Sequence, residues 1–414
     1  MAVRSVPIGS LAPGLNNRLE PTQLDTALPN RRPATYLYAA DNVDINAKGY
    51  LKRRRGQTTA ISGRAHSIWS TSPFSEAFAV INGNLERLRD GGADFTRVIV
   101  RPNMPQLPVS FSRGADNAVY WSNGVTLRRV INGEDRPAVT DALDTAPLVA
   151  VGKGEGSLRA GRYLVAFTRT GPDGESAATP IVQLQVPEGS AISWSASDVV
   201  NVFLSAPNGE ILIYQTLGLG GSVPVHTQSG RECDTLNLAP MPPGTIVRHY
   251  KGRMLVVSGN LLFYSLPYQY GVYDPASGYL AFAEPISVVE VVDGGIFIAA
   301  DKTYALADLV EGQLVERLPY GAIPFTSGTL PRSKQGSQVF WQSVHGLVIG
   351  NPDLSLANVQ EDALDVPSAT AGATLFRDRD GLRQIIATRT RVEPSVAVAS
   401  SYMEAEIMKK GTFQ

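Results

Sequence analysis

The 414-residue sequence is poor in the residue types that support several common kinds of site. It contains one cysteine, Cys233, so no intrachain disulfide can form and the fold must depend on burial. Its four histidines, His66, His226, His249 and His345, have no histidine or cysteine partner at metal-ligand spacing. We therefore expect no metal site, no cofactor and no catalytic residue.

Two further absences concern membranes and nucleic acids. No apolar run approaches the roughly 20 residues of a membrane-spanning helix, and the opening MAVRSVPIGSLAPG lacks the apolar core of a signal peptide. The chain has 37 basic and 38 acidic residues, a formal net charge of -1. This balance argues against tight nucleic-acid binding, which depends on phosphate neutralisation, but it permits transient passage of DNA. We expect synthesis in the cytosol, without secretion and without stable membrane insertion.

The sequence does contain a repeated pattern of strand, turn and strand. Six segments join two strand-like runs by a short turn, which is typical of β-hairpins: residues 77–88, 117–130, 253–265, 294–308, 337–351 and 373–387. Their anchor residues lie 41, 136, 42, 43 and 35 positions apart: Phe78, Val119, Leu255, Phe297, Phe340 and Leu375. Four of these steps are close to the length of a four-stranded blade, about 40 to 45 residues. The sequence therefore predicts an all-β fold, a β-propeller of about five to six blades.

The step of 136 residues indicates an insertion at residues 146–240. Within it, LRAGRYLVAFTRTGPDGESAAT and NVFLSAPNGEILIYQT contain alternating strands and Pro-Asp-Gly or Pro-Asn-Gly turns. Evenly spaced short strands suit a small β-sandwich, and their order resembles a fibronectin type III-like module. LGLGGS, residues 217–222, lacks the Lys-Ser/Thr and the helix of a phosphate loop, and we expect a mobile loop of the inserted module there.

The predicted organisation has five parts. They are an extended N-terminal arm at 1–36, propeller segments at 37–145 and 241–400 on either side of the inserted sandwich at 146–240, and a tail at 401–414. The arm is rich in Pro, Asn and Arg and is expected to become ordered against another surface. Residues 400–411 have a composition that suits either a helix or a closing strand.

Arg53, Arg54 and Arg55 form one candidate contact region, at the end of YLKRRRG. One interpretation is a solvated edge strand whose charge prevents aggregation. The other is a surface for an acidic partner or DNA.

A second candidate contact region is rich in tyrosine. LLFYSLPYQYGVYDPASGY, residues 261–279, combines a strand with a loop that contains Pro and Gly. Its candidate contact residues are Tyr264, Tyr268, Tyr270 and Tyr273. Tyrosine rings bury area while the hydroxyl tolerates water, so these residues suit either a subunit or partner contact or packing between adjacent blades.

Two stretches carry a family resemblance. DNVDINAKGYLKRRRG, residues 41–56, resembles the opening of many bacteriophage tail structural proteins, and GTIVRHYKGRMLVVSGNLLFYSLPYQYGVYDPASGYLAF, residues 244–282, resembles them too. The resemblance implies a propeller-like body, self-association into a ring, and a position in the tail as hub, nozzle or adaptor.

The leading hypothesis is a non-enzymatic structural protein of the virion tail, assembled in the host cytoplasm. About six copies would form a ring-like hub or nozzle that connects tail components, such as the adaptor, portal or fibre, and allows the genome to pass. One alternative is a tail-tip binding module that attaches fibres or contacts the host surface. A second alternative is a carbohydrate-active propeller enzyme.

Overall fold

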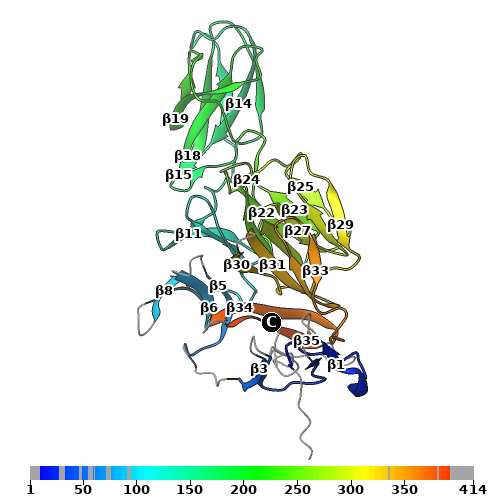
Figure 1. Ribbon diagram of the computed structural model, residues 1–414. Coiled ribbons are helices and arrows are strands. Elements are labelled where there is room, and N and C mark those ends of the chain that lie inside the picture. Colours follow the sequence, from blue (N-terminus) through cyan, green and yellow to red (C-terminus); the bar gives the residue numbers. More distant parts are fainter. Residues whose placement is uncertain are drawn as a thin grey trace, which may run out of the picture. The chain divides into compact units, whose positions relative to one another are not determined.

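A computed structural model describes residues 10–27, 33–45, 49–54, 59, 61–70, 76–90, 95–333, 336–379 and 382–391. These residues are almost all β, with 35 strands and one short 3-10 helix, η1 (Pro21–Gln23), which confirms the predicted class (Figure 1). In this part of the chain, no helix is long and apolar enough to cross a membrane. The predicted tail at 401–414 lies outside the described residues. The chain divides into two compact units, residues 63–281 and residues 1–62 with 282–414.

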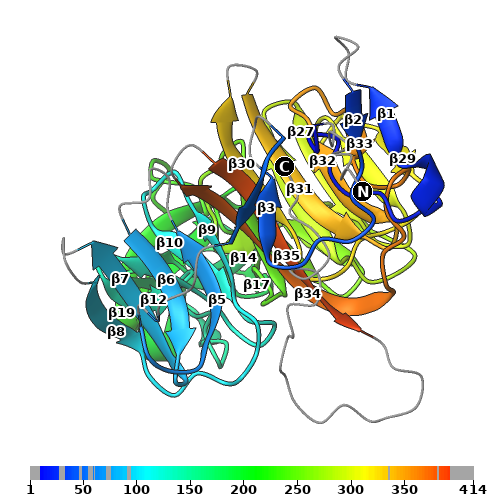
Figure 2. The same ribbon diagram turned by 60° about the horizontal axis from the view of Figure 1, so that its bottom comes forward.

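Unit 63–281 contains three four-stranded antiparallel sheets. The first consists of β5 (Ala65–Ser70), β6 (Glu76–Ile81), β7 (Asn84–Asp90) and β8 (Phe95–Arg101), of which β5, β6 and β7 lie side by side in Figure 2. The second consists of β9 (Ser110–Arg113), β10 (Val119–Ser122), β11 (Leu127–Ile131) and β12 (Glu134–Pro137). The third consists of β21 (Ile246–Tyr250), β22 (Arg253–Ser258), β23 (Leu261–Tyr264) and β25 (Tyr279–Ala281). A small sheet pairs β20 (Ala239–Pro240) with β24 (Val272–Tyr273).

The other unit contains two four-stranded antiparallel sheets and three two-stranded ones. The first four-stranded sheet consists of β26 (Val288–Val292), β27 (Gly295–Ala299), β28 (Thr303–Leu306) and β29 (Leu314–Leu318). The second consists of β30 (Gly328–Ser333), β31 (Gly336–Ser343), β32 (Gly346–Gly350) and β33 (Leu356–Asn358). The two-stranded sheets pair β1 (Asp25–Ala27) with β2 (Pro33–Thr35), β3 (Val43–Ile45) with β4 (Leu51–Arg53), and β34 (Ala369–Arg379) with β35 (Leu382–Arg391).

All six predicted hairpins are confirmed, as β6–β7, β10–β11, β22–β23, β27–β28, β31–β32 and β34–β35. Turn chemistry explains the first of them, because Asn82 and Gly83 have φ angles of 51° and 77°, as a two-residue hairpin turn requires. Each of the first five supplies the two central strands of a four-stranded sheet. The sixth, β34–β35, pairs with no third strand among the described residues.

Adjacent sheets within each unit bury their apolar faces against one another. Successive residues of a strand point to opposite faces, so β10 places Trp121 in the core shared with the first sheet and Tyr120 in the core shared with the third. In the other unit, Phe297 and Trp341 meet at a ring-centroid distance of 5.6 Å. Buried aromatic side chains of this size contribute much of the stability of such cores.

The residues predicted to form an insertion contain a separate group of strands. They are β13 (Leu148–Gly152), β14 (Gly161–Thr168), β17 (Val182–Val186), β18 (Ala191–Ser205) and β19 (Leu212–Val223), with the short pair β15 (Thr170–Gly171) and β16 (Gly174–Glu175). Figure 1 shows β14, β18 and β19 together. The long strand β18 pairs with β13 at Ala191–Ser195 and with β14 at Asn201–Leu204. We call this group the β13–β19 module; its own core includes Phe167, Trp194 and Val202.

The predicted mobile loop at 217–222 is wrong, because these residues lie in β19, and all of them except Leu219 pair with β18. The glycine at position 221 has a steric explanation, because a larger residue there would collide with a neighbouring side chain. Gly221 is opposite Trp194, and a Cβ at position 221 would lie 2.8 Å from the tryptophan ring. The glycine at this position therefore reflects close packing of a side chain and not a turn.

Candidate interaction surfaces

Two of the predicted arginines, Arg53 and Arg54, have different environments in and beside the β3–β4 hairpin. Arg53 is paired across the hairpin with Val43, and its side chain is exposed, as is that of Leu51. Arg54 instead donates from Nε to Asp44 Oδ1 at 3.1 Å, and both side chains are largely buried. Arg55 lies outside the described residues. Arg53 is therefore the arginine that the described hairpin offers to a partner.

Two of the four candidate tyrosines have opposite environments. Tyr268 is 75% exposed, has a φ of 60°, and receives support from Gly252, whose carbonyl accepts its N–H. Tyr270 is buried, with its ring 5.4 Å from that of Tyr120 and 5.5 Å from that of His249. Tyr270 thus packs between the second and third sheets, whereas Tyr268 is available on the surface.

The other two tyrosines are half-buried. The Tyr273 ring lies 5.1 Å from the Phe263 ring, edge to face, and the Tyr264 hydroxyl donates to the Ser277 carbonyl. These contacts stabilise the loop between β23 and β25. The contact role predicted for the four tyrosines stays a prediction.

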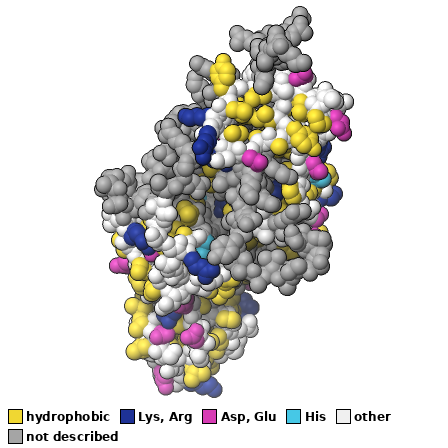
Figure 3. Space-filling view, turned by 90° about the horizontal axis from the view of Figure 1, so that it is seen from below, with side chains coloured by type: hydrophobic (Ala, Val, Ile, Leu, Met, Phe, Trp, Pro, Cys, Tyr) yellow, Lys and Arg dark blue, Asp and Glu magenta, His cyan; other side chains and the backbone are white. Residues whose placement is uncertain are grey.

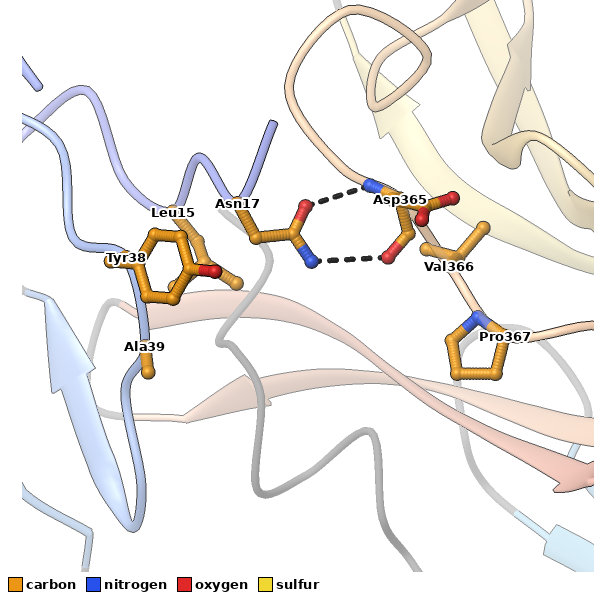
Figure 4. Close-up of a pocket in the computed structure, with 7 residues that line it drawn as sticks. All are labelled: Leu15, Asn17, Tyr38, Ala39, Asp365, Val366 and Pro367. Atoms are coloured by element: carbon orange, nitrogen blue, oxygen red, sulfur yellow. Dashed lines mark hydrogen bonds between the residues drawn. The ribbon is translucent and has the colours of Figure 1, made fainter. Parts of the chain in front are cut away.

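The N-terminal arm borders a pocket of about 370 Å³ (Figure 4). Asn17 fixes the arm to the opposite wall, since its Nδ2 donates to the Asp365 carbonyl at 3.0 Å and its Oδ1 accepts from the Asp365 N–H at 2.7 Å. The Asn17 N–H also donates to the Ala363 carbonyl at 3.1 Å. The lining residues are Leu15, Asn17, Tyr38, Ala39, Asp365, Val366 and Pro367.

Replacing Asn17 with alanine is expected to increase the rate of tryptic cleavage at the exposed Arg18 about fivefold. The substitution removes both side-chain hydrogen bonds to Asp365, together worth about 1 kcal/mol at a solvent-accessible site. Thr22→Ala, at an exposed position of the same arm, is the control. Equal cleavage of Asn17→Ala, Thr22→Ala and the parent chain would show that Asn17 does not hold the arm.

A partly buried ion pair joins the β13–β19 module to the second sheet. Arg129 of β11 donates from Nη2 to Asp173 Oδ1, in the β15–β16 turn, at 3.1 Å. The Asp173 side chain is only 8% exposed and that of Arg129 15%. Arg129 also donates to the Tyr120 hydroxyl at 3.4 Å, and Thr140 donates to the Gly174 carbonyl at 2.7 Å. This cluster, the Arg129 clamp, fixes the base of the module.

A second buried arginine closes the β34–β35 hairpin onto β31. Arg389 is 5% exposed and donates to Gln342 Oε1, the Ser343 carbonyl and the Pro367 carbonyl at 2.7 to 3.2 Å. Burial lowers the pKa of Arg389 to about 10, so the side chain is still charged at neutral pH. Because Pro367 also lines the pocket, Arg389 anchors the wall to which Asn17 binds.

Burial shifts the pKa of the cysteine and of two histidines. Burial raises the pKa of the Cys233 thiol to about 11, so the protonated form predominates at neutral pH. Burial also lowers the pKa of His66 and of His249. Within the described ranges, no group of three or more His, Cys, Asp or Glu side chains could hold a metal ion. Basic and acidic side chains are interspersed over the described part of the face in Figure 3.

No protein-family model and no curated protein sequence matches this chain. Among solved structures, BBS1N in complex with ARL6DN aligns over 80% of this chain and 91% of its own, at 10% identity and a TM-score of 0.34. A functionally unknown protein from Desulfotomaculum acetoxidans aligns over 73% and 88%, at 11% identity and a TM-score of 0.30. Virginiamycin B lyase from Staphylococcus aureus aligns over 77% and 90%, at 10% identity and a TM-score of 0.25. These values are too low to transfer a fold or a function.

Proposed function

We propose that the chain is a structural protein of a bacteriophage tail that assembles into a ring, as hub or nozzle, connects tail components and lets DNA pass. The observation that carries the proposal is the β3–β4 hairpin. Its sequence resembles phage tail proteins, and it presents Leu51 and Arg53 at the surface, where a neighbouring subunit or tail protein can bind them.

The proposal includes a finer description of the fold. The five four-stranded sheets are blades of a β-propeller, because each is an antiparallel meander and adjacent sheets of a unit share a core. The β13–β19 module is a fibronectin type III-like sandwich. The register shift of β18 between Ser195 and Val200 supports this, because it lets one strand contribute to two facing sheets.

Electron microscopy and sedimentation of the purified chain test the ring. We expect closed rings. We also expect Arg53→Glu to lower the association constant at least about tenfold, because a glutamate at this position would repel the acidic partner group that attracts the arginine. Arg317→Glu, at an exposed position of β29, is the control. A single-chain mass at all concentrations, in the presence and absence of other tail proteins, would contradict the ring. Rings of equal stability in both variants would exclude Arg53 from the interface.

A further inference from the structure

At one end of the five-stranded sheet of the β13–β19 module, three strands lie side by side and leave two open edges. The middle strand is the first part of β18, which pairs with β13 on one side and with residues 220–223 of β19 on the other. Among the described residues, neither β13 nor residues 216–222 of β19 pair with any further strand. Farther back in β19, residues 231–233 cover the edge by hydrogen bonds to Leu212 and Tyr214.

Both open edges lack the features that normally prevent strand pairing. Neither β13, LVAVG, nor β19, LIYQTLGLGGSV, contains a charged residue or a proline. Several outer strands of the four-stranded sheets do carry such residues, since β8 has Arg97 and Arg101, β29 has Glu316 and Arg317, and β12 reads EDRP, whereas β25 and β33 do not. Alternate residues of an uncovered edge offer N–H and C=O groups to another strand, and charge or proline usually blocks such pairing.

The two edges also have complementary shapes. The register places Leu148, Ser195 and Gly220 in one row across the sheet, and Leu148 at the β13 end is 78% exposed. The β19 end of the row has no side chain. The Trp194 ring requires Gly221, and a Cβ at Gly220 would lie 3.2 Å from the Trp194 carbonyl oxygen, whereas a Cβ at Gly218 would meet only ordinary contacts. A large apolar side chain at one edge thus matches a glycine-rich segment at the other.

We propose that β13 of one copy adds to the 216–222 segment of β19 in the next copy, so that the module sheets continue from subunit to subunit. Both strands run antiparallel to β18, so the new pair is parallel, and Leu148 of the incoming copy covers the glycine-rich segment. The contact is head-to-tail, and a repeated head-to-tail contact closes into a ring when its rotation permits. This inference rests on the proposed ring and adds a second contact surface to that of the β3–β4 hairpin.

A second copy is the occupant that the two edges favour. The β13 edge offers the large Leu148 side chain, and the β19 edge offers glycines that leave room for it. Neither edge carries a charge that could select a strand of another protein. Pairing of β19 with β19 of another copy would place glycine beside glycine and leave Leu148 exposed. That arrangement would also pair two molecules without extending to a third.

Cysteine cross-linking in a Cys233→Ser background distinguishes these arrangements. Neighbouring strands lie about 4.8 Å apart, within the reach of a disulfide. We expect a disulfide dimer when Leu148→Cys and Leu219→Cys chains are mixed and oxidised, and none from either chain alone. A chain with both substitutions should give a ladder of cross-linked species that ends at the subunit number of the ring.

Three results would overturn the inference. Dimers from Leu219→Cys alone, or from a mixture with Leu217→Cys, would show that β19 pairs with itself. Absence of cross-links while microscopy shows rings would place the ring contact on another surface and leave the proposed function intact. Absence of both cross-links and rings would reject the proposed ring as well.

A charge at the open edge gives an independent test. Leu148→Lys is expected to weaken self-association about tenfold or more, since it removes the burial of one leucine and places a charge in the strand contact. The fold should be unaffected, because Leu148 is 78% exposed in the single chain. Val225→Lys, 58% exposed and just beyond β19, is the matched control, and equal association of the two variants would overturn the proposal.

Discussion

Replacing Arg389 with alanine is expected to lower the free energy of unfolding of the unit formed by residues 1–62 and 282–414 by about 3–5 kcal/mol. The guanidinium supplies hydrogen bonds to Gln342 Oε1 and to the Ser343 and Pro367 carbonyls. Its removal leaves these acceptors without their donor, two of them in a buried environment, and opens a cavity beside β31.

The effect should extend to the N-terminal arm. Pro367 follows the Asp365 backbone that binds Asn17, so loss of the Arg389 contact loosens the wall that holds the arm. We expect a lower guanidinium midpoint together with faster cleavage at Arg18. Arg383→Ala is the matched control, because Arg383 lies on the same strand, is 64% exposed and pairs with Asp378 at the surface.

Arg383→Ala should cost about 0.5 kcal/mol or less. A loss in Arg389→Ala that does not exceed this value would mean that the buried arginine contributes no net stability. Arg389→Lys separates charge from geometry, because a lysine keeps the charge but cannot reproduce the planar fork of donors. We expect Arg389→Lys to lose most of the stability that Arg389→Ala loses.

The hairpins could be predicted from the sequence because their signals are local. A turn such as Asn82-Gly83 fixes the connection, and the apolar runs on either side of it supply the buried strands. The glycine-rich segment of β19 was mispredicted as a loop for the same reason, since its glycines resemble turn residues. The cause of Gly221, the ring of Trp194, is 27 positions away in the sequence (221 minus 194) and is visible only in the register of β18 with β19.

The contact residues could be predicted only in part, because exposure depends on neighbours from other sheets. Tyr268 and Tyr270 are two positions apart in the same loop, yet Tyr270 lies under the second sheet beside Tyr120 and Tyr268 does not. For Arg389, a signal was present in the sequence. Ile385, Ala387 and Arg389 alternate along one strand, so a charged residue continues an apolar face.

Replacing Arg129 with methionine is expected to destabilise unit 63–281 by about 3 kcal/mol. Methionine fills a similar volume, so the main loss is the donor to Asp173, whose carboxylate is 8% exposed and would remain buried without its cation. The Tyr120 hydroxyl loses the same partner. Because the pair joins the second sheet to the β15–β16 turn, the module should also change its angle to that sheet more freely. Guanidinium denaturation measures the first effect and small-angle X-ray scattering the second.

The cross-strand neighbour of Arg129 provides the control for this prediction. Arg136 pairs with Arg129 in the register of β11 with β12, but it binds the exposed Glu134, so Arg136→Met should cost about 0.5 kcal/mol or less. A double-mutant cycle with Asp173→Leu isolates the ion pair itself. Since the double variant leaves no buried charge, it should regain more than 1 kcal/mol relative to the sum of the single variants. Additive losses would show that Arg129 and Asp173 are not coupled, and the module would then be held to the second sheet by its other contacts, including the bond from Thr140 to the Gly174 carbonyl.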